Sequence, residues 1–437
     1  MDGKLSHRLH YPIREHVLPR GTFLEHLDVS LTWMWARDQT QWPNFFDDFR
    51  NFGFNLIPTF PYTWQQRQGL SRVWNPKVKE TGLGLISDAK TFGNRIILND
   101  SPFHAIPAVI LRARKEGLSK PETEQGVFLR DANGKLTEKP NPFYRGYYYQ
   151  KEMERVKALV QECLPDHIYW DIELWHESVH LAQTDPDILH QWKASGKSWE
   201  DFVTDAGTEM LRDLYNAVKE AMGERPMPQI GLYGAYATQA APTDGVFEWS
   251  KIYPKYISLS MPSLYVQGRT TDVLERIKAD YAKVGKNIIP WLSPATYGAA
   301  PPPTMESMVL ESVLNGAKGI AYFQYQDFDP LHFYYHTRAL TTLGGFADLM
   351  QKGAPRTILG ANADLTYTCF ASDSEALILV GNYNRSSDNR TIIPTVFPNA
   401  LTSEIREGKR MEYAKSVEEV AVPPGGFLLY HQKGSAP

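Results

Sequence analysis

The chain has 437 residues, of which 42% are hydrophobic and 22% are charged, and its formal net charge is −4. This balance predicts a globular protein and leaves no broad charged field for binding nucleic acid or an anionic membrane surface. The two cysteines, Cys163 and Cys369, lie far apart in the sequence. A disulfide framework or a CxxC metal or redox site is therefore not expected.

The sequence leaves the compartment and the oligomeric state open. The first 20 residues lack the apolar segment of a signal peptide. A run of about 18 apolar residues, which a membrane-spanning helix needs, does not occur either. We expect a secreted or periplasmic protein if a signal peptide was removed, and a cytoplasmic protein otherwise.

Short apolar segments alternate with amphipathic segments along residues 23–352. The expected strands are residues 26–31, 55–59, 95–99, 167–172, 229–233, 257–261, 287–292 and 319–325. The expected helices include residues 43–54, 151–163, 199–222, 271–284, 305–314 and 337–350. Eight successive strand–helix units predict an α/β fold, a (β/α)8 TIM barrel that carries the catalytic residues.

Three further segments complete the predicted domain organisation. Residues 1–22 are an N-terminal extension. Residues 100–148 are expected to be a long loop insertion that leaves the C-terminal end of the third strand, where barrel enzymes place their chemistry. After residue 352, short alternating segments separated by turn residues predict a small antiparallel β-sandwich domain over residues 353–437.

The most informative segment is HIYWDIELW, residues 167–175. Its apolar, aromatic and β-branched start predicts a buried strand, on which Tyr169, Asp171 and Glu173 share one face. Two neighbouring carboxylates push their pKa values apart, so one can stay protonated as an acid while the other stays ionised. The alternative is that one of them only caps the helix that follows.

Further candidate residues for binding a substrate lie at or just after the C-terminal ends of the expected strands. Aromatic rings there suit the C–H faces of a pyranose, and carboxylates and amides suit its hydroxyls, so a carbohydrate is the expected partner. A phosphate-binding loop and a dinucleotide fingerprint are absent, and we expect no cofactor. The candidates are Asp28, Trp33, Tyr62, Asn99, His104, Trp175, His176, Tyr233, Tyr265, Trp291, Tyr322, Gln324 and Asp327.

Over essentially its whole length the chain resembles a glycoside hydrolase with a (β/α)8 barrel and a C-terminal β-sandwich. The ending VPPGGFLLYHQ is similar to the last strand of such sandwiches, and ESVLNGAKGIAYFQYQDFD is similar to the last helix–strand passage of such barrels. The D-x-E of Asp171 and Glu173 resembles chitinase-like and lysozyme-like barrels, although Asp166 and His167 replace the upstream aspartates of chitinases. The resemblance implies that Glu173 is the general acid/base and Asp171 the stabilising carboxylate.

The same resemblance excludes some of the catalytic mechanisms that glycoside hydrolases use. Cellulase-like barrels carry a nucleophilic Glu on strand seven, whereas IIPWLSPATYG has no carboxylate there. Strand six, LSMPSLY, also lacks one, which disfavours the α-galactosidase type. Two routes remain: a 2-acetamido group of the substrate acts as nucleophile, or a third carboxylate (Asp28, Asp327 or Asp329) holds the attacking water.

A competing motif follows directly. Residues 176–180 match H-E-x-x-H, in which two histidines bind zinc and Glu177 acts as a base. Gln183 and Pro186 stand where a metzincin has its glycine and third histidine, and the motif follows a strand instead of lying in a long helix. We therefore expect no metal. A zinc metallohydrolase and a non-catalytic carbohydrate-binding protein are the alternatives to a glycosidase.

Overall fold

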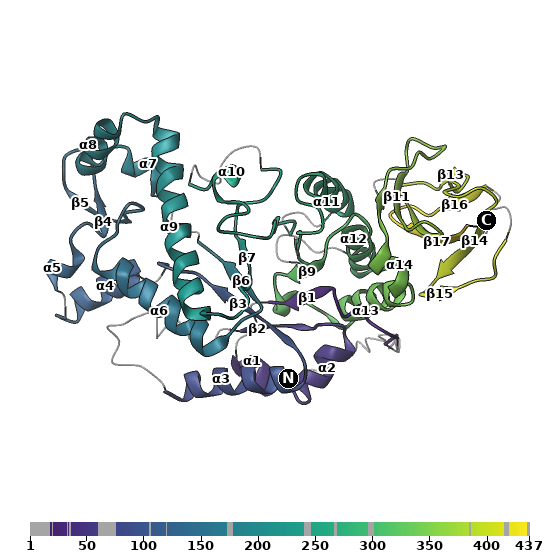
Figure 1. Ribbon diagram of the computed structural model, residues 1–437, viewed down its shortest axis with the longest axis horizontal. Helices are drawn as coiled ribbons and strands as arrows, with labels where there is room; N and C mark the ends of the chain where they lie inside the picture. The colour runs from purple at the N-terminus through teal and green to yellow at the C-terminus, as the bar shows by residue number, and fades with distance from the viewer. Residues whose placement is uncertain are drawn as a thin grey trace, which may run out of the picture.

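The structure is a computed structural model in which parallel strands with surrounding helices precede an antiparallel sheet (Figure 1). It describes residues 18–19, 21–32, 34, 36–59, 76–104, 106–118, 120–172, 178–239, 246–265, 269–295, 301–383, 386–414 and 419–434. Within these ranges, no helix combines the length and the apolar character needed to cross a membrane.

The parallel strands form two sheets. One sheet has the order β2-β3-β6-β7 and the other β1-β9-β8. The strands are β1 (Asp28–Leu31), β2 (Leu56–Thr59), β3 (Arg95–Asp100), β6 (His167–Trp170), β7 (Gln229–Leu232), β8 (Trp291–Leu292) and β9 (Gly319–Tyr322). These strands coincide with seven of the eight expected positions, because each is a short apolar run between helices.

Backbone hydrogen bonds join the two sheets at both edges. The Asn55 amide donates to the Val29 carbonyl at 3.2 Å, which connects β2 to β1. At the other edge, residues 257–263 lie between β7 and β8, and the Ser258 amide donates to the Ile230 carbonyl at 2.8 Å. This segment forms only isolated bridges, not the regular strand expected over residues 257–261. Pro262 and Pro290 lack an amide hydrogen, which shortens the ladder here.

Helices cover the outside of the strands, and most lie where the 3.6-residue period predicts them. They are α1 (Ala36–Gln41), α2 (Phe45–Asn51), α3 (Pro76–Thr91), α6 (Tyr147–Cys163), α9 (Trp199–Met222), α10 (Trp249–Ile252), α11 (Thr270–Val284), α12 (Pro302–Leu314), α13 (Pro330–Gly344) and α14 (Ala347–Lys352). The single helix expected over residues 337–350 is in fact two, because glycine is a poor helix former and the chain has Gly344 and Gly345 at the break.

Residues 100–148 are not the loop that the sequence suggested. They form α4 (Ile106–Lys115), α5 (Pro121–Glu124) and an antiparallel hairpin of β4 (Phe128–Arg130) and β5 (Leu136–Pro140). The hairpin packs against α7 (Val179–Ala182) and α8 (Pro186–Ser195), and Leu129, Ala182 and Ile188 share a buried cluster. These elements gather at one end of the molecule (Figure 1).

The side chains of the parallel strands separate into an inner and an outer set. Tyr169 and Trp291 belong to a small buried cluster on the inner face, with Ile97 and Met261. Trp170, the neighbour of Tyr169, belongs to the large cluster under the helices. This alternation confirms the face that the sequence predicted for Tyr169.

The C-terminal region is an antiparallel sheet with a two-stranded partner. The order is β10-β11-β12-β17-β14-β15, and β13 pairs with β16. The strands are β10 (Ala354–Arg356), β11 (Thr366–Ala371), β12 (Glu375–Gly381), β13 (Asn389–Thr391), β14 (Leu401–Arg406), β15 (Lys409–Arg410), β16 (Val420–Val422) and β17 (Phe427–Lys433). Buried Glu311 on α12 joins the two regions, because its carboxylate accepts hydrogen bonds from Thr368 (2.7 Å) and Tyr383 (2.8 Å).

Candidate functional site

Asp171 follows the last residue of β6 and lies on the same face as inward-pointing Tyr169. Its amide donates to the Asp100 carbonyl at 2.8 Å, so the backbone continues the parallel ladder for one more residue. The side chain is half-buried, and its Oδ2 lies 3.3 Å from the Ser101 hydroxyl. The structure therefore holds a partly accessible carboxylate at the C-terminal end of an inner strand.

Ser101, which donates a hydrogen bond to Asp171, is a candidate site residue that was not predicted from the sequence. It is buried and lies two residues beyond Asn99, on the inner side of the same chain segment. Extending the strand alternation by one step past the end of β3 would have found it.

A buried ion-pair network holds the turn that follows β3. Arg155 on α6 donates to Asp100 Oδ2 at 2.6 Å and to Glu152 Oε1 at 2.8 Å. Glu152 in turn accepts the Phe103 amide at 3.0 Å, and Phe103 adopts a positive φ of 68°. Because Asp100 also supplies the carbonyl that binds the Asp171 amide, this network fixes both sides of the candidate site.

Aromatic side chains surround the inner face near these strand ends. The rings of Tyr169 and Trp291 lie 4.4 Å apart between centroids, and those of Tyr265 and Phe323 lie 5.3 Å apart. Tyr233, Tyr265 and Phe323 are only partly buried. Of these residues, Tyr233, Tyr265 and Trp291 are among the substrate-binding candidates predicted from the sequence, and Tyr169 and Phe323 are not.

Several buried polar atoms on this inner face lack a hydrogen-bond partner within the part of the chain that the structure describes. They are both amide atoms of Asn99, the hydroxyl of Ser263 and the indole nitrogen of Trp291. Asn99 is 2% exposed and Trp291 is 1% exposed. A buried polar group without a partner costs about 1–3 kcal/mol, so a polar ligand or water at these atoms would be stabilising.

Asp28 does not lie at the strand ends where the sequence analysis placed it. It is the first residue of β1, and it pairs with two other first residues, Arg95 of β3 and His167 of β6. The distance from His167 Nε2 to Asp28 Oδ2 is 3.0 Å. Asp28 therefore belongs to a closed polar cluster at the N-terminal end of the strands, and its assignment to the substrate site was wrong.

Tyr322 also corrects the expected site. Its neighbour Ala321 faces inward, whereas the fully buried Tyr322 points outward, and its hydroxyl lies 2.7 Å from Nδ1 of His336 on α13. Burial holds the pKa of His336 at about 3, so the imidazole is neutral there. Tyr322 supports the helix layer and does not line the inner face.

The remaining candidates have varied positions. His104 lies in the turn after β3, Gln324 follows β9, and Asp327 ends the short 3-10 helix η1 (Tyr325–Asp327); all three are partly buried. Asp329 caps α13 by accepting the amides of Leu331 and His332. Glu173, Trp33, Tyr62, Trp175 and His176 lie outside the described residues.

The H-E-x-x-H motif is only partly visible. Residues 176–177 are outside the described ranges, and His180 is exposed on α7, a helix of four residues. Among the described residues, no group of three or more His, Cys, Asp or Glu side chains could hold a metal ion.

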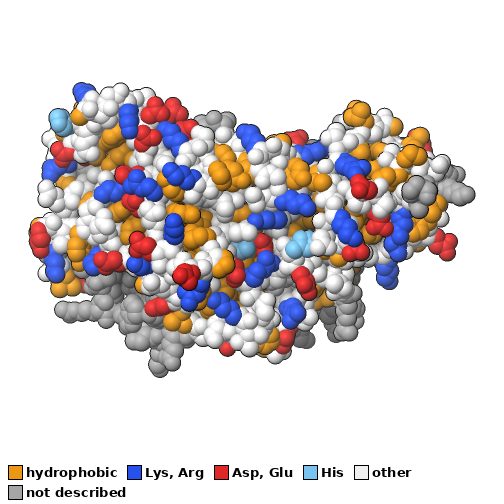
Figure 2. Space-filling view, in the orientation of Figure 1, with side chains coloured by type: hydrophobic (Ala, Val, Ile, Leu, Met, Phe, Trp, Pro, Cys, Tyr) orange, Lys and Arg blue, Asp and Glu red, His pale blue; other side chains and the backbone are white. Residues whose placement is uncertain are grey.

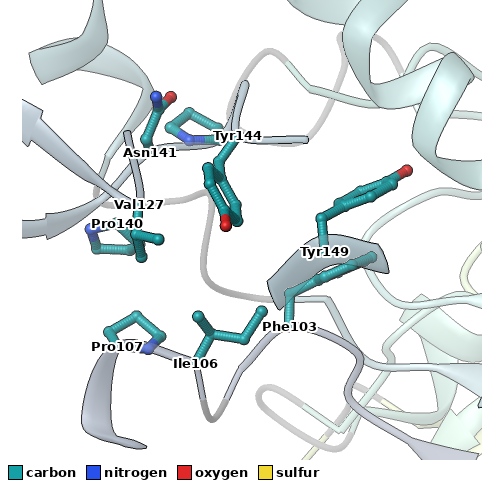
Figure 3. A pocket seen from close by; sticks show the side chains of 9 residues that line it. Phe103, Ile106, Pro107, Val127, Pro140, Asn141, Tyr144 and Tyr149 are labelled. Atoms are coloured by element: carbon teal, nitrogen blue, oxygen red, sulfur yellow. The ribbon is translucent and has the colours of Figure 1, made fainter. Parts of the chain in front are cut away.

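A separate small cavity lies inside the insertion (Figure 3). Its volume is about 40 Å³, and Phe103, Ile106, Val127, Tyr144 and Tyr149 are among its lining residues. The Tyr149 hydroxyl donates to Asp213 Oδ2 at 2.8 Å. A space of this size holds one or two water molecules and is too small for a sugar ring.

No family model matches the sequence, and no curated protein matches it. Solved structures with a similar fold are found. A GH27 β-L-arabinopyranosidase from Geobacillus stearothermophilus, in complex with arabinose, has a TM-score of 0.55 at 11% identity, covering 94% of this chain and 98% of that one. An α-amylase from Geobacillus thermoleovorans, complexed with acarbose, has a TM-score of 0.53 at 10% identity, covering 95% and 100%.

A glycoside hydrolase of family 5 from Bacteroides vulgatus also matches, with a TM-score of 0.52 at 10% identity, covering 94% of this chain and 90% of that one. At such identities the likeness concerns the fold alone. This chain thus has the mixed α/β fold of glycoside hydrolases, with an antiparallel sheet at its C-terminus, and the fold expected from the resemblance is confirmed at that level. The catalytic residues and the substrate remain predictions.

Proposed function

We propose that this protein is a glycoside hydrolase that cleaves O-glycosidic bonds of an oligo- or polysaccharide. The reaction takes place at the C-terminal ends of its parallel strands. The strands and the segment 257–263 form a closed (β/α)8 barrel, which the hydrogen bonds at both edges of the two sheets support. In such a barrel the catalytic residues project from the C-terminal ends of the strands.

One observation carries the proposal: the partly accessible carboxylate of Asp171 lies at the C-terminal end of an inner strand, on a face that also carries buried polar atoms without a partner among the described residues. Asp28, by contrast, is almost fully buried between Arg95 and His167. Asp171 is half-buried and accepts a hydrogen bond from the Ser101 hydroxyl, which stabilises its negative charge.

In the proposed reaction, Glu173 is the general acid/base, and Asp171 stays ionised and orients the group that attacks the sugar. Two routes remain. A 2-acetamido group can attack with help from Asp171, or a third carboxylate can hold a water. Asp28 is excluded as that carboxylate by its position, and Asp329 is occupied as a helix cap. Asp327 is therefore the candidate for the second route.

A panel of aryl glycosides with and without a 2-acetamido group tests the proposal, together with natural polysaccharides. We expect hydrolysis of at least one sugar, and loss of that activity in Glu173→Gln. Removal of metal ions with a chelator should leave the rate of hydrolysis unchanged. If chelation abolished hydrolysis and added zinc restored it, the zinc metallohydrolase would be the better interpretation. If the protein binds polysaccharide but hydrolyses nothing on the panel, it is a carbohydrate-binding protein and the proposal is wrong.

A further inference from the structure

Residues 233–239 follow directly on β7, at the C-terminal end of the strands. The Tyr233 amide donates to the Trp170 carbonyl at 2.8 Å, so Tyr233 continues the parallel ladder next to Asp171. The Tyr233 side chain packs against the small buried cluster on the inner face. The conformation of residues 233–239 therefore sets where Tyr233 lies relative to the proposed catalytic carboxylate.

No long helix follows this segment in the described part of the chain. Between β7 and residues 257–263, the described residues contain one helix, α10, which has only four residues. The crossover from β6 to β7, by comparison, contains α9 with 24 residues. A segment of this kind depends on its own hydrogen bonds and contacts for a fixed conformation. The side chains that bind residues 233–239 are therefore important for the site.

Asp280 on α11 is the centre of these hydrogen bonds. Its Oδ1 accepts the hydroxyl of Thr238, and its Oδ2 accepts the hydroxyl of Ser260, both at 2.5 Å. Ser260 Oγ in turn accepts the Ala237 amide at 3.0 Å. One carboxylate thus connects two adjacent residues of the segment, Ala237 and Thr238, to α11 and to residues 257–263.

Arg276 adds a second connection from the same helix. It lies four residues before Asp280, so both side chains share one face of α11. Its Nη1 donates to the Thr238 hydroxyl at 2.5 Å, and its guanidinium lies 4.7 Å from the ring centroid of Tyr236. The Thr238 hydroxyl accepts from Arg276 and donates to Asp280, so its direction is fixed.

The burial of Asp280 shows that it is not an ordinary charged residue of a helix surface. Acidic and basic side chains are spread over the face of the molecule in Figure 2, whereas Asp280 is 0% exposed. Burial raises its pKa, and the hydrogen bonds from Ser260 and Thr238 act against this increase. Because a buried carboxylate is costly compared with an apolar side chain of similar volume, packing alone does not explain an aspartate at this position.

We propose that Asp280 is a positioning residue of the proposed active site. Through Ser260 and Thr238, its carboxylate holds residues 233–239 in place and keeps Tyr233 beside Asp171, where it binds the substrate. The inference rests on the proposed function, because it assumes a substrate at the C-terminal ends of the strands. Loss of these hydrogen bonds should weaken substrate binding and leave the chemical step unchanged.

The test variant is Thr238→Val, which removes the hydroxyl between Asp280 and Arg276 with little change in volume. Thr238→Ser keeps this hydroxyl. Thr208→Val is a matched control, because it removes another half-buried hydroxyl, which donates to the Thr204 carbonyl within α9. With an aryl glycoside that the wild type hydrolyses, we expect Thr238→Val to raise KM about tenfold with kcat unchanged. Thr238→Ser and Thr208→Val should both keep the wild-type KM.

Hydrogen exchange of the four proteins without substrate, followed by mass spectrometry, is the second measurement. The amides of residues 233–239 should exchange about tenfold faster in Thr238→Val than in the other three proteins. The inference is overturned if these exchange rates are equal, if Thr238→Val keeps the wild-type KM, or if Thr238→Ser raises KM as much as Thr238→Val does.

Failure of the proposed function gives a different result. A wild type that hydrolyses no glycoside refutes the proposed function and, with it, the positioning of Tyr233 for a substrate, even if the exchange rates differ as expected. An active wild type whose KM is unchanged by Thr238→Val refutes the role of Asp280 alone.

Discussion

The two ends of the parallel strands both carry a carboxylate on the inner face, but its surroundings differ. At the N-terminal end, Asp28 is 3% exposed and is held by Arg95 and by His167 Nε2 at 3.0 Å. At the C-terminal end, Asp171 is only partly buried and contacts the Ser101 hydroxyl at 3.3 Å. The two carboxylates therefore differ in burial and in position along the strands, and we expect Asp28 to serve stability while Asp171 is the proposed catalytic carboxylate.

The uncharged polar residues show the same difference. At the N-terminal end, Gln229 accepts a hydrogen bond from Lys318, and burial lowers the pKa of that lysine. At the C-terminal end, both amide atoms of Asn99 lack a partner among the described residues. Among the described residues, Nδ1 of His167 is also without a partner at the N-terminal end, so the difference concerns the amide groups of Gln229 and Asn99.

The largest expected effect is on catalysis. Asp171→Asn should lower kcat by roughly two to four orders of magnitude, the range expected for a lost catalytic carboxylate, with little change in the midpoint of thermal unfolding. Asp187→Asn is a matched control, because Asp187 is an exposed carboxylate whose ion-pair partner among the described residues, Arg130, is distant at 3.9 Å. Normal turnover by Asp171→Asn would refute the assignment of the catalytic end.

Asp28→Asn should have the opposite effects: a lower free energy of unfolding and an unchanged kcat. It leaves Arg95 and His167 without their carboxylate, and breaking a buried ion pair costs about 3 kcal/mol of unfolding free energy. The kcat of the folded protein should be unchanged, because the proposed catalytic site is at the other end of the strands. Urea denaturation and a glycoside assay on the same preparation measure both values. If Asp28→Asn were as stable as the wild type but inactive, the catalytic carboxylate would lie at the N-terminal end of the strands and not at the C-terminal end.

A third prediction concerns the loss of stability at acidic pH. Burial lowers the folded-state pKa of His336 to about 3 from 6.5, so as the pH falls below 6.5 the unfolded chain binds a proton that the folded chain does not. Stability should fall by about 2 kcal/mol between pH 6.5 and pH 5 from this residue. Replacing the pair, Tyr322→Phe/His336→Leu, should reduce the loss by that amount.

The measurement is urea denaturation of the wild type and the double variant at pH 7 and pH 5. His431 of the C-terminal sheet, whose pKa burial lowers to about 4, adds a loss of the same sign that both proteins share. If the free energy of unfolding falls by the same amount from pH 7 to pH 5 in the wild type and in the double variant, His336 is not buried in its neutral form.

The smallest expected effect comes from replacing one amide side chain by leucine at each end of the parallel strands. Asn99→Leu removes an amide that has no partner in the described part of the chain. We therefore expect an unfolding free energy that is unchanged or higher by about 1 kcal/mol, together with a severalfold rise in KM. Gln229→Leu removes the partner of Lys318 and should lower the free energy by about 1–2 kcal/mol with KM unchanged. If Asn99→Leu and Gln229→Leu changed the free energy of unfolding equally, the amides at the two ends of the strands would contribute equally to stability.

Much of the fold follows from local sequence patterns. The 3.6-residue period predicts α9 as residues 199–222, the bounds that the structure shows. Period-two alternation correctly places Tyr169 on the inner face and Trp170 on the outer one. These features depend on side chains a few residues apart, whose spacing is visible in the sequence. The insertion was misjudged because its helices and hairpin are short and gain stability from contacts with α7 and α8.

The sequence by itself determined an α/β fold, an antiparallel C-terminal region and the position of Asp171 at the end of a buried strand. Only the tertiary structure decided that Asp28 begins its strand beside Arg95 and His167, and that Tyr322 faces His336. The physical reason is register. A shift of one residue along a strand moves a side chain to the other face, and a shift of a few residues moves it to the other end, and both are set by contacts with strands and helices distant in sequence.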